Sequence, residues 1–187
     1  MEWLSLNRTT DALTEPVTLS EVKLWLKIAT TETTDDDLIT SLIKTARIKC
    51  EQYTNRSFID QSWTLRLDCS PDSICLPKPP LDSVTSINIL ADDGTTTLQD
   101  SDDYQVIPDE GSVVFLETGN SWTTSTRPFG QMVIVYKSGY GDAAANVPDT
   151  IKTVIKQLTA YFYENREETE IPGFIESALN NYKVYNV

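Results

Sequence analysis

The spacing of apolar residues changes twice along this chain of 187 residues, and these changes constrain its fold more than any single motif does. Apolar residues follow a helical period up to residue 56, a strand period over 57–146, and a helical period again over 147–187. Each helix must bury its apolar stripe against another element. The pattern therefore predicts an α+β protein. N- and C-terminal helices form a small helical layer or bundle, and an antiparallel β-module, sandwich-like or barrel-like, is inserted between them.

Three parts follow from these borders: an N-terminal helical part (1–56), a β-rich module (57–146), and C-terminal helices with a tail (147–187). Helix ends are signalled locally. Thr18 and Glu21 have the spacing of a capping box, and Asn55 can end the second helix in a left-handed conformation. The stripe predicted to be buried on that second helix comprises Leu38, Leu42, Ala46 and Tyr53, widened by Ile39, Ile43 and Cys50.

In the middle part, apolar and polar residues alternate. Trp63, Leu65 and Leu67 are each followed by a polar residue, which predicts a half-buried strand. Further strands are expected at 84–89 and 132–136, and Asp92-Asp93-Gly94 is a turn signal. About six short strands separated by turns favour a small antiparallel β-module over a parallel sheet.

The amino-acid composition excludes several kinds of catalytic and metal-binding site. The chain has no histidine, which excludes Ser-His-Asp and Cys-His catalysis and histidine-ligated metal sites. The cysteines Cys50, Cys69 and Cys75 are odd in number and lack a CxxC spacing, so we expect buried or half-buried free thiols. The chain holds 28 acidic and 15 basic residues, and its net charge of −13 disfavours tight binding of nucleic acid. No apolar run is long enough to span a membrane, and we expect assembly in the cytoplasm.

Three clusters of charged residues in the sequence are candidate ligand sites. Asp35, Asp36 and Asp37 are consecutive and would point in different directions on a helix, which does not suit a metal site. We interpret them as helix-capping residues, with Thr34 or Asp35 as the cap and negative charge at the positive end of the helix dipole. Asp100, Asp102 and Asp103 lack the glycine and closing glutamate of a calcium loop. Lys44, Arg47 and Lys49 form a basic stripe that could face phosphate or could be an ordinary solvated helix face.

The last fourteen residues are rich in apolar and aromatic side chains. Two hypotheses account for them: the tail packs on its own domain, or it docks on a neighbouring subunit or partner, as aromatic anchors do at interfaces. The residues concerned are Phe174, Ile175, Leu179, Tyr182, Val184 and Tyr185.

Several short segments occur in a characteristic order and spacing along the chain. They are TLSEVKLWLKI from Thr18, DDLI from Asp36, EQYTNR from Glu51, QSW from Gln61, LPKPPL from Leu76, SGYGD from Ser138, YENRE from Tyr163 and YKV from Tyr182. Taken together, these segments resemble the head–tail connector (adaptor, or head-completion) proteins of long-tailed bacteriophages and gene-transfer agents. Asn55 departs from the resemblance, because glycine is usual at that position.

The resemblance implies a structural protein of the virion neck, without catalysis or cofactor. Such proteins form a ring, typically of twelve copies, between the portal protein and the next neck, stopper or tail protein, and double-stranded DNA passes through without tight binding. By analogy, the C-terminal residues Phe174, Ile175, Leu179, Tyr182, Val184 and Tyr185 would dock on the portal. Acidic residues would face the channel, and the candidates are Asp35, Asp36, Asp37, Glu167, Glu168 and Glu170.

Two other functions stay open at this point. A β-domain of a phage or cell surface could bind a glycan or another ligand through Trp63, Trp122 or Tyr140. A hydrolase using a pair of carboxylates is a more distant alternative, because nothing in the sequence singles out such a pair.

Overall fold

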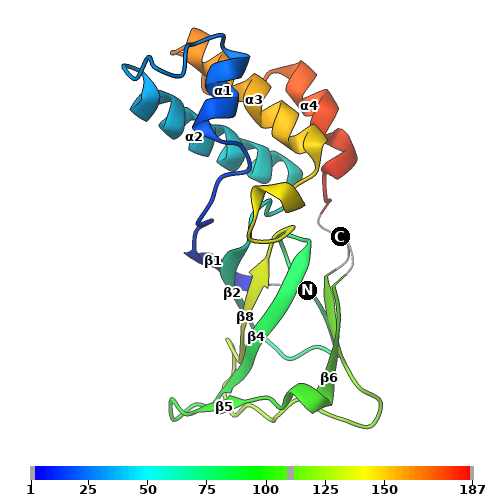
Figure 1. Ribbon diagram of the computed structural model, residues 1–187. Coiled ribbons are helices and arrows are strands. Elements are labelled where there is room, and N and C mark those ends of the chain that lie inside the picture. Colours follow the sequence, from blue (N-terminus) through cyan, green and yellow to red (C-terminus); the bar gives the residue numbers. More distant parts are fainter. Residues whose placement is uncertain (1–2, 109–111, 186–187) are drawn as a thin grey trace. The chain divides into compact units, whose positions relative to one another are not determined.

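The computed structural model describes residues 3–108 and 112–185, which form two units (Figure 1). The β unit comprises residues 1–12 and 60–140, and the helical unit comprises residues 13–59 and 141–187. The helical unit is thus assembled from both halves of the chain, with a β part inserted between them. The α+β class is confirmed.

In the described part of the helical unit there are four α-helices: α1 (Leu19–Trp25), α2 (Asp36–Thr54), α3 (Asp149–Glu164) and α4 (Gly173–Leu179). Short 3₁₀ turns lie at Ala144–Asn146 and Asn180–Tyr182. The predicted capping box is present at α1. The Thr18 hydroxyl accepts from the Glu21 amide at 3.2 Å, and the Glu21 carboxylate accepts from the Thr18 amide at 2.7 Å.

The buried face of α2 is rotated relative to the predicted stripe. Ile39, Ile43 and Cys50 are buried as expected, whereas Leu38 and Leu42 are only half-buried. The polar residues Arg47, Glu51 and Thr54 lie on the buried face as well. Helix α2 contacts α1, α3 and α4, whose buried side chains include Val22, Ile151, Val154, Ile155, Leu158, Phe162, Ile175 and Leu179.

The β unit contains two antiparallel sheets. The larger sheet has the strand order β1-β2-β8-β4-β5, and the smaller one has the order β3-β7-β6. A short 3₁₀ turn, Ser101–Asp103, precedes β6. The described strands close no barrel. Their bounds are β1 Trp3–Thr10, β2 Gln61–Leu67, β3 Ser73–Cys75, β4 Leu81–Leu90, β5 Thr96–Leu98, β6 Tyr104–Ile107, β7 Val113–Leu116 and β8 Met132–Ser138.

Strand β1 corrects one feature of the sequence interpretation. The apolar pattern places residues 3–10 in the N-terminal helical part. In the structure they form an edge strand that pairs antiparallel with β2, with Leu6 opposite Leu65. The physical reason is that this edge strand buries little surface. None of its residues is fully buried, so it carries no clear alternation of apolar and polar residues.

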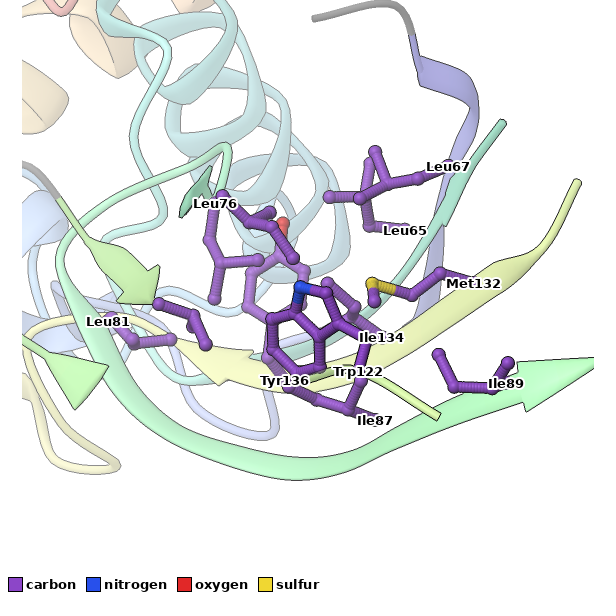
Figure 2. Close-up of a cluster of buried hydrophobic side chains, with 12 residues drawn as sticks. Leu65, Leu67, Leu76, Leu81, Ile87, Ile89, Trp122, Met132, Ile134 and Tyr136 are labelled. Carbon is purple, nitrogen blue, oxygen red and sulfur yellow. The ribbon is translucent and has the colours of Figure 1, made fainter. Parts of the chain in front are cut away.

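The core of the β unit is formed by side chains from both sheets and from the loop before β8 (Figure 2). Leu65, Ile134 and Tyr136 alternate inward along β2 and β8, and Trp122 packs among them. The polar atoms of these two aromatic side chains have partners. The Trp122 Nε1–H donates to the Pro71 carbonyl at 2.7 Å, and the Tyr136 hydroxyl donates to the Pro77 carbonyl at 2.8 Å.

Helix α1 ends in a Schellman motif that places a lysine in a left-handed conformation. The Ile28 amide donates to the Lys23 carbonyl at 2.9 Å and the Lys27 amide to the Leu24 carbonyl at 3.2 Å. Lys27 has φ of 60°. A residue with a Cβ pays about 1–2 kcal/mol for this conformation, which glycine adopts freely.

We therefore predict that Lys27→Gly stabilises the helical unit by about 0.5–1 kcal/mol, the relief of strain being partly offset by the greater entropy of unfolded glycine. Urea unfolding followed by far-ultraviolet circular dichroism measures the change. Lys27→Ala is the matched control and should give no gain, because alanine keeps the Cβ. A loss of stability in Lys27→Gly would contradict the assignment.

Candidate docking and channel surfaces

The C-terminal residues divide into two groups in the structure. Ile175 and Leu179 are fully buried in the helical unit, where α4 packs on α3 and α2. Phe174 is 59% exposed and Tyr185 is 70% exposed. Tyr182 and Val184 are half-buried. The segment is therefore anchored on its own unit by some of the six predicted residues, while others present apolar surface to solvent.

The tail is clamped to the end of α2. Asn55 follows α2 with φ of 56°, the left-handed conformation expected for it. The Val184 amide donates to the Thr54 carbonyl at 2.9 Å, and Asn55 Nδ2 donates to the Val184 carbonyl at 3.0 Å. Arg56 Nε donates to the Tyr182 carbonyl at 2.6 Å. Three consecutive residues of the helix end thus hold the tail.

Aromatic side chains add to this clamp. The Tyr53 hydroxyl donates to Asn180 Oδ1 at 2.7 Å. The Lys183 ammonium lies 4.3 Å from the centre of the Tyr53 ring and 5.7 Å from that of Tyr185. Both are distances at which a cation is attracted to a ring face. Apart from Asn55, no signal in the sequence pointed to this contact, because it consists mainly of hydrogen bonds to backbone carbonyls.

The predicted acidic residues at the start of α2 have different environments. Asp35 accepts a hydrogen bond from the Tyr163 hydroxyl, and this bond raises the pKa of that hydroxyl. Asp36 pairs with Lys23, with 2.7 Å between Oδ1 and Nζ. Asp37 is exposed. Asp35 occupies the N-cap position of α2 but makes no side-chain cap hydrogen bond; its carboxylate accepts from the Tyr163 hydroxyl instead.

The other predicted acidic residues, Glu167, Glu168 and Glu170, are exposed in the loop between α3 and α4. The bond between Asp35 and Tyr163, near the end of α3, places the start of this loop beside the start of α2. The structure therefore brings the two acidic stretches to the same end of the helical unit. We call them together the acidic edge.

The basic stripe on α2 is not a phosphate-facing surface. Arg47 is fully buried. Its Nε lies 2.8 Å from Glu15 Oε2, and its Nη1 lies 2.9 Å from Glu51 Oε2. A guanidinium so enclosed by two carboxylates has no access to a phosphate. The phosphate interpretation of the stripe is wrong at its central residue.

The aromatic residues considered for ligand binding offer no open platform. Trp122 is 8% exposed, and its ring lies in the core of the β unit with a centroid 6.1 Å from that of Tyr104. Trp63 packs against the same core, and Tyr140 is half-buried. Stacking of a sugar on a tryptophan needs an exposed ring face, which Trp122 does not have. The glycan hypothesis thereby loses its strongest candidate residue.

The thiols and carboxylates are not gathered into a metal centre among the described residues. Burial raises the pKa of the Cys50 thiol to about 12, so this thiol is unreactive at neutral pH. Cys69 and Cys75 are exposed, not buried as expected. In the described part of the chain no helix is both long and apolar enough to cross a membrane.

An anchored tail with exposed aromatic side chains, and an acidic edge apart from it, are features of a structural protein that makes contacts with other macromolecules. The sequence matches the family described as head completion protein over residues 15–178. Since the match spans most of the chain, this protein belongs to the head completion protein family. No curated protein matches the sequence.

Solved structures with a similar fold come from gene transfer agent (GTA) particles. A chain in the neck of an empty GTA particle, computed with C6 symmetry, aligns with a TM-score of 0.84 at 19% identity, covering 98% of this chain and 97% of that one. A chain in the neck of a native GTA particle, computed with C12 symmetry, gives 0.80 at 19% with the same coverage. A chain from the virion of a native GTA particle gives 0.82 at 18%, again covering 98% and 97%. At these identities the similarity shows a shared fold.

The clamp predicts a local effect of Asn55. Asn55→Gly keeps the left-handed conformation but removes the side-chain bond to Val184, so we expect the Val184 amide to exchange about 2- to 10-fold faster with little change in global stability. Hydrogen exchange read by NMR measures this amide.

Asn55→Ala is the comparison variant. It removes the same bond and also strains the end of α2, so it should lower global stability as well. Unchanged exchange at Val184 in both variants would show that the tail does not depend on this clamp.

Proposed function

We propose that this protein is a head–tail connector of a virion neck, which forms a ring of identical subunits, twelve by family analogy, between the portal protein and the next neck or tail protein. The observation that carries the proposal is the match of fold over 98% of the chain to subunits of GTA necks, together with membership of the head completion family. Shape and assembly would supply the activity, so no catalytic group or cofactor is invoked. Assembly would take place in the host cytoplasm.

The ring would line the path of double-stranded DNA. Each copy carries a net charge of −13, and a channel bordered by acidic groups repels phosphates and leaves no site where the duplex is held. We assign the acidic edge to this border. Its exposed members Asp37, Glu167, Glu168 and Glu170 would face the DNA, and Asp35 and Asp36, which are engaged by Tyr163 and Lys23, would support them.

The tail would dock on the portal. Its exposed residues Phe174 and Tyr185 are the natural anchors, with Tyr182 and Val184 beside them. Ile175 and Leu179 would contribute by fixing α4 in the helical unit. The clamp at the end of α2 would then present the tail in one conformation, which lowers the entropic cost of docking.

Deletion of the gene tests the proposed function. We expect DNA-filled heads that do not join tails, and restoration of joined particles by the wild-type chain supplied from a plasmid. Electron microscopy of purified particles provides the count. Normal joining of heads to tails in the deletion would overturn the proposal.

The tail is tested by the double variant Phe174→Ser/Tyr185→Ser. Both side chains are exposed, so the melting temperature should change by no more than about 2 °C, while attachment of the protein to portal-containing heads is lost.

Leu98→Ser, which removes an exposed apolar side chain of the β unit, is the matched control and should leave attachment intact. Wild-type attachment by the double variant would place the docking surface elsewhere.

A further inference from the structure

The helical unit carries an open apolar groove that its own side chains leave unfilled. The groove has a volume of about 620 Å³. Val17, Leu19 and Ile43 line it together with Ala143, and two acidic residues, Glu15 and Asp142, border it. The carboxylate of Glu15 is engaged by Arg47, whereas Asp142 is exposed and holds Thr14 through its backbone carbonyl only. The groove thus offers an apolar floor with an available negative charge at its rim.

A matching projection lies at the end of α1. Leu24 is 78% exposed and Trp25 is 45% exposed. Two lysines flank them: Lys27 in the Schellman turn, and Lys156, whose ammonium lies 5.8 Å from the centre of the Trp25 ring. The projection is therefore an apolar pair with positive charges beside it.

Nearby acidic groups act on one of the two charges. The Glu21 carboxylate is bonded to Thr18 in the capping box, and Asp149 pairs with Lys152, with 2.7 Å between Oδ1 and Nζ. Lys156 also interacts electrostatically with both carboxylates and contributes to the lowering of their pKa values. Among the described residues neither carboxylate forms a salt bridge with Lys27, so Lys27 supplies the positive charge of the rim.

We propose that the groove of one copy receives Leu24 and Trp25 of the next copy, with Lys27 facing Asp142 across the contact. This inference rests on the proposed ring. The inference names the two surfaces through which neighbouring subunits would close the ring. A groove and a different, complementary projection form a head-to-tail contact, the type that generates rings larger than dimers.

The helix geometry prevents Leu24 and Trp25 from filling the groove of their own copy. Leu19 lines the groove, and at about 100° per residue Leu24 and Trp25 lie about 140° and about 120° from it on either side of α1. The projection and the groove therefore face different directions on one helix. The contact has to be between copies.

Charge also favours the projection over Phe174, another exposed apolar side chain of the helical unit. Phe174 is exposed to a similar degree, but Glu176 follows it on α4 and Glu170 precedes it, so it would bring like charge to Asp142. Like charges at an interface oppose association. Phe174 thus serves as the matched control.

The test is disulfide capture with cysteines at two exposed positions, Leu24→Cys and Ala143→Cys, in a full-length chain carrying Cys69→Ser and Cys75→Ser. On mild oxidation of the concentrated protein, alone and with portal, we expect a ladder of covalent oligomers on a non-reducing gel. Either cysteine alone should give dimers at most. Phe174→Cys with Ala143→Cys, which is tested without portal because Phe174 is a proposed portal anchor, should give no ladder.

Charge reversal sharpens the test. Asp142→Lys in the Leu24→Cys/Ala143→Cys chain should reduce the ladder at least about 10-fold, and adding Lys27→Glu should restore it. All of these positions are exposed, so folding is preserved and circular dichroism verifies it.

The outcomes separate this inference from the proposed function. Absence of the ladder, or a ladder equal to that of the Phe174→Cys control, overturns the groove contact. If the wild-type chain still forms rings by mass measurement with portal present, the connector function stands and another surface closes the ring. If no ring forms under either condition, both proposals fall.

Discussion

A buried arginine holds the helical unit together. Arg47 on α2 has no exposed surface and is paired with Glu15 and Glu51 at 2.8 and 2.9 Å. Glu51 also accepts from the Phe58 amide at 2.9 Å. Arg47 and Glu51 therefore connect α2 to two other segments: the one before α1, through Glu15, and the one after α2, through Phe58. Removing one partner of such a network costs about 3–5 kcal/mol, because a buried charge is left unpaired.

The surfaces proposed to act in assembly depend on α2 placed in this way. Near the start of α2, Asp35 accepts a hydrogen bond from the Tyr163 hydroxyl, and the acidic edge begins there. In its first half, Ile43 forms part of the apolar groove. At its end, Thr54 and Asn55 clamp the tail. One helix thus sets the spacing of the proposed channel border, the proposed subunit contact and the proposed docking tail, and a ring component needs such fixed spacing.

Local signals made much of the fold predictable from sequence. The Thr18 capping box, the left-handed Asn55 and the alternation along β2 depend on neighbouring residues only, and all three are present. The buried face of α2 differs from the predicted one. Apolar spacing favours Leu38 and Leu42, but the core accepts Arg47 because Glu51, one turn along the helix, and Glu15, 32 residues earlier, satisfy its charge. Apolar periodicity cannot reveal such partners.

The candidate site was predictable only in part. The richness of the tail in aromatic residues identified the segment, yet the division between buried Ile175 and exposed Phe174 depends on how α4 packs on α3. The acidic stretches were visible as charge runs, but their meeting at one end of the unit depends on the bond between Asp35 and Tyr163, which are 128 residues apart. The groove could not be predicted from the sequence, because residues 14–19 and 142–144 come together only in the folded protein.

The central claim is that this chain acts as a ring part between head and tail. A subunit-resolved cryo-electron microscopy map of the neck of its own particle tests it most directly. The account predicts a closed ring of this chain beneath the portal, with the acidic edge toward the DNA and the tail against the portal. A neck map in which this chain is missing, or is present without contacts between its copies, would contradict the account.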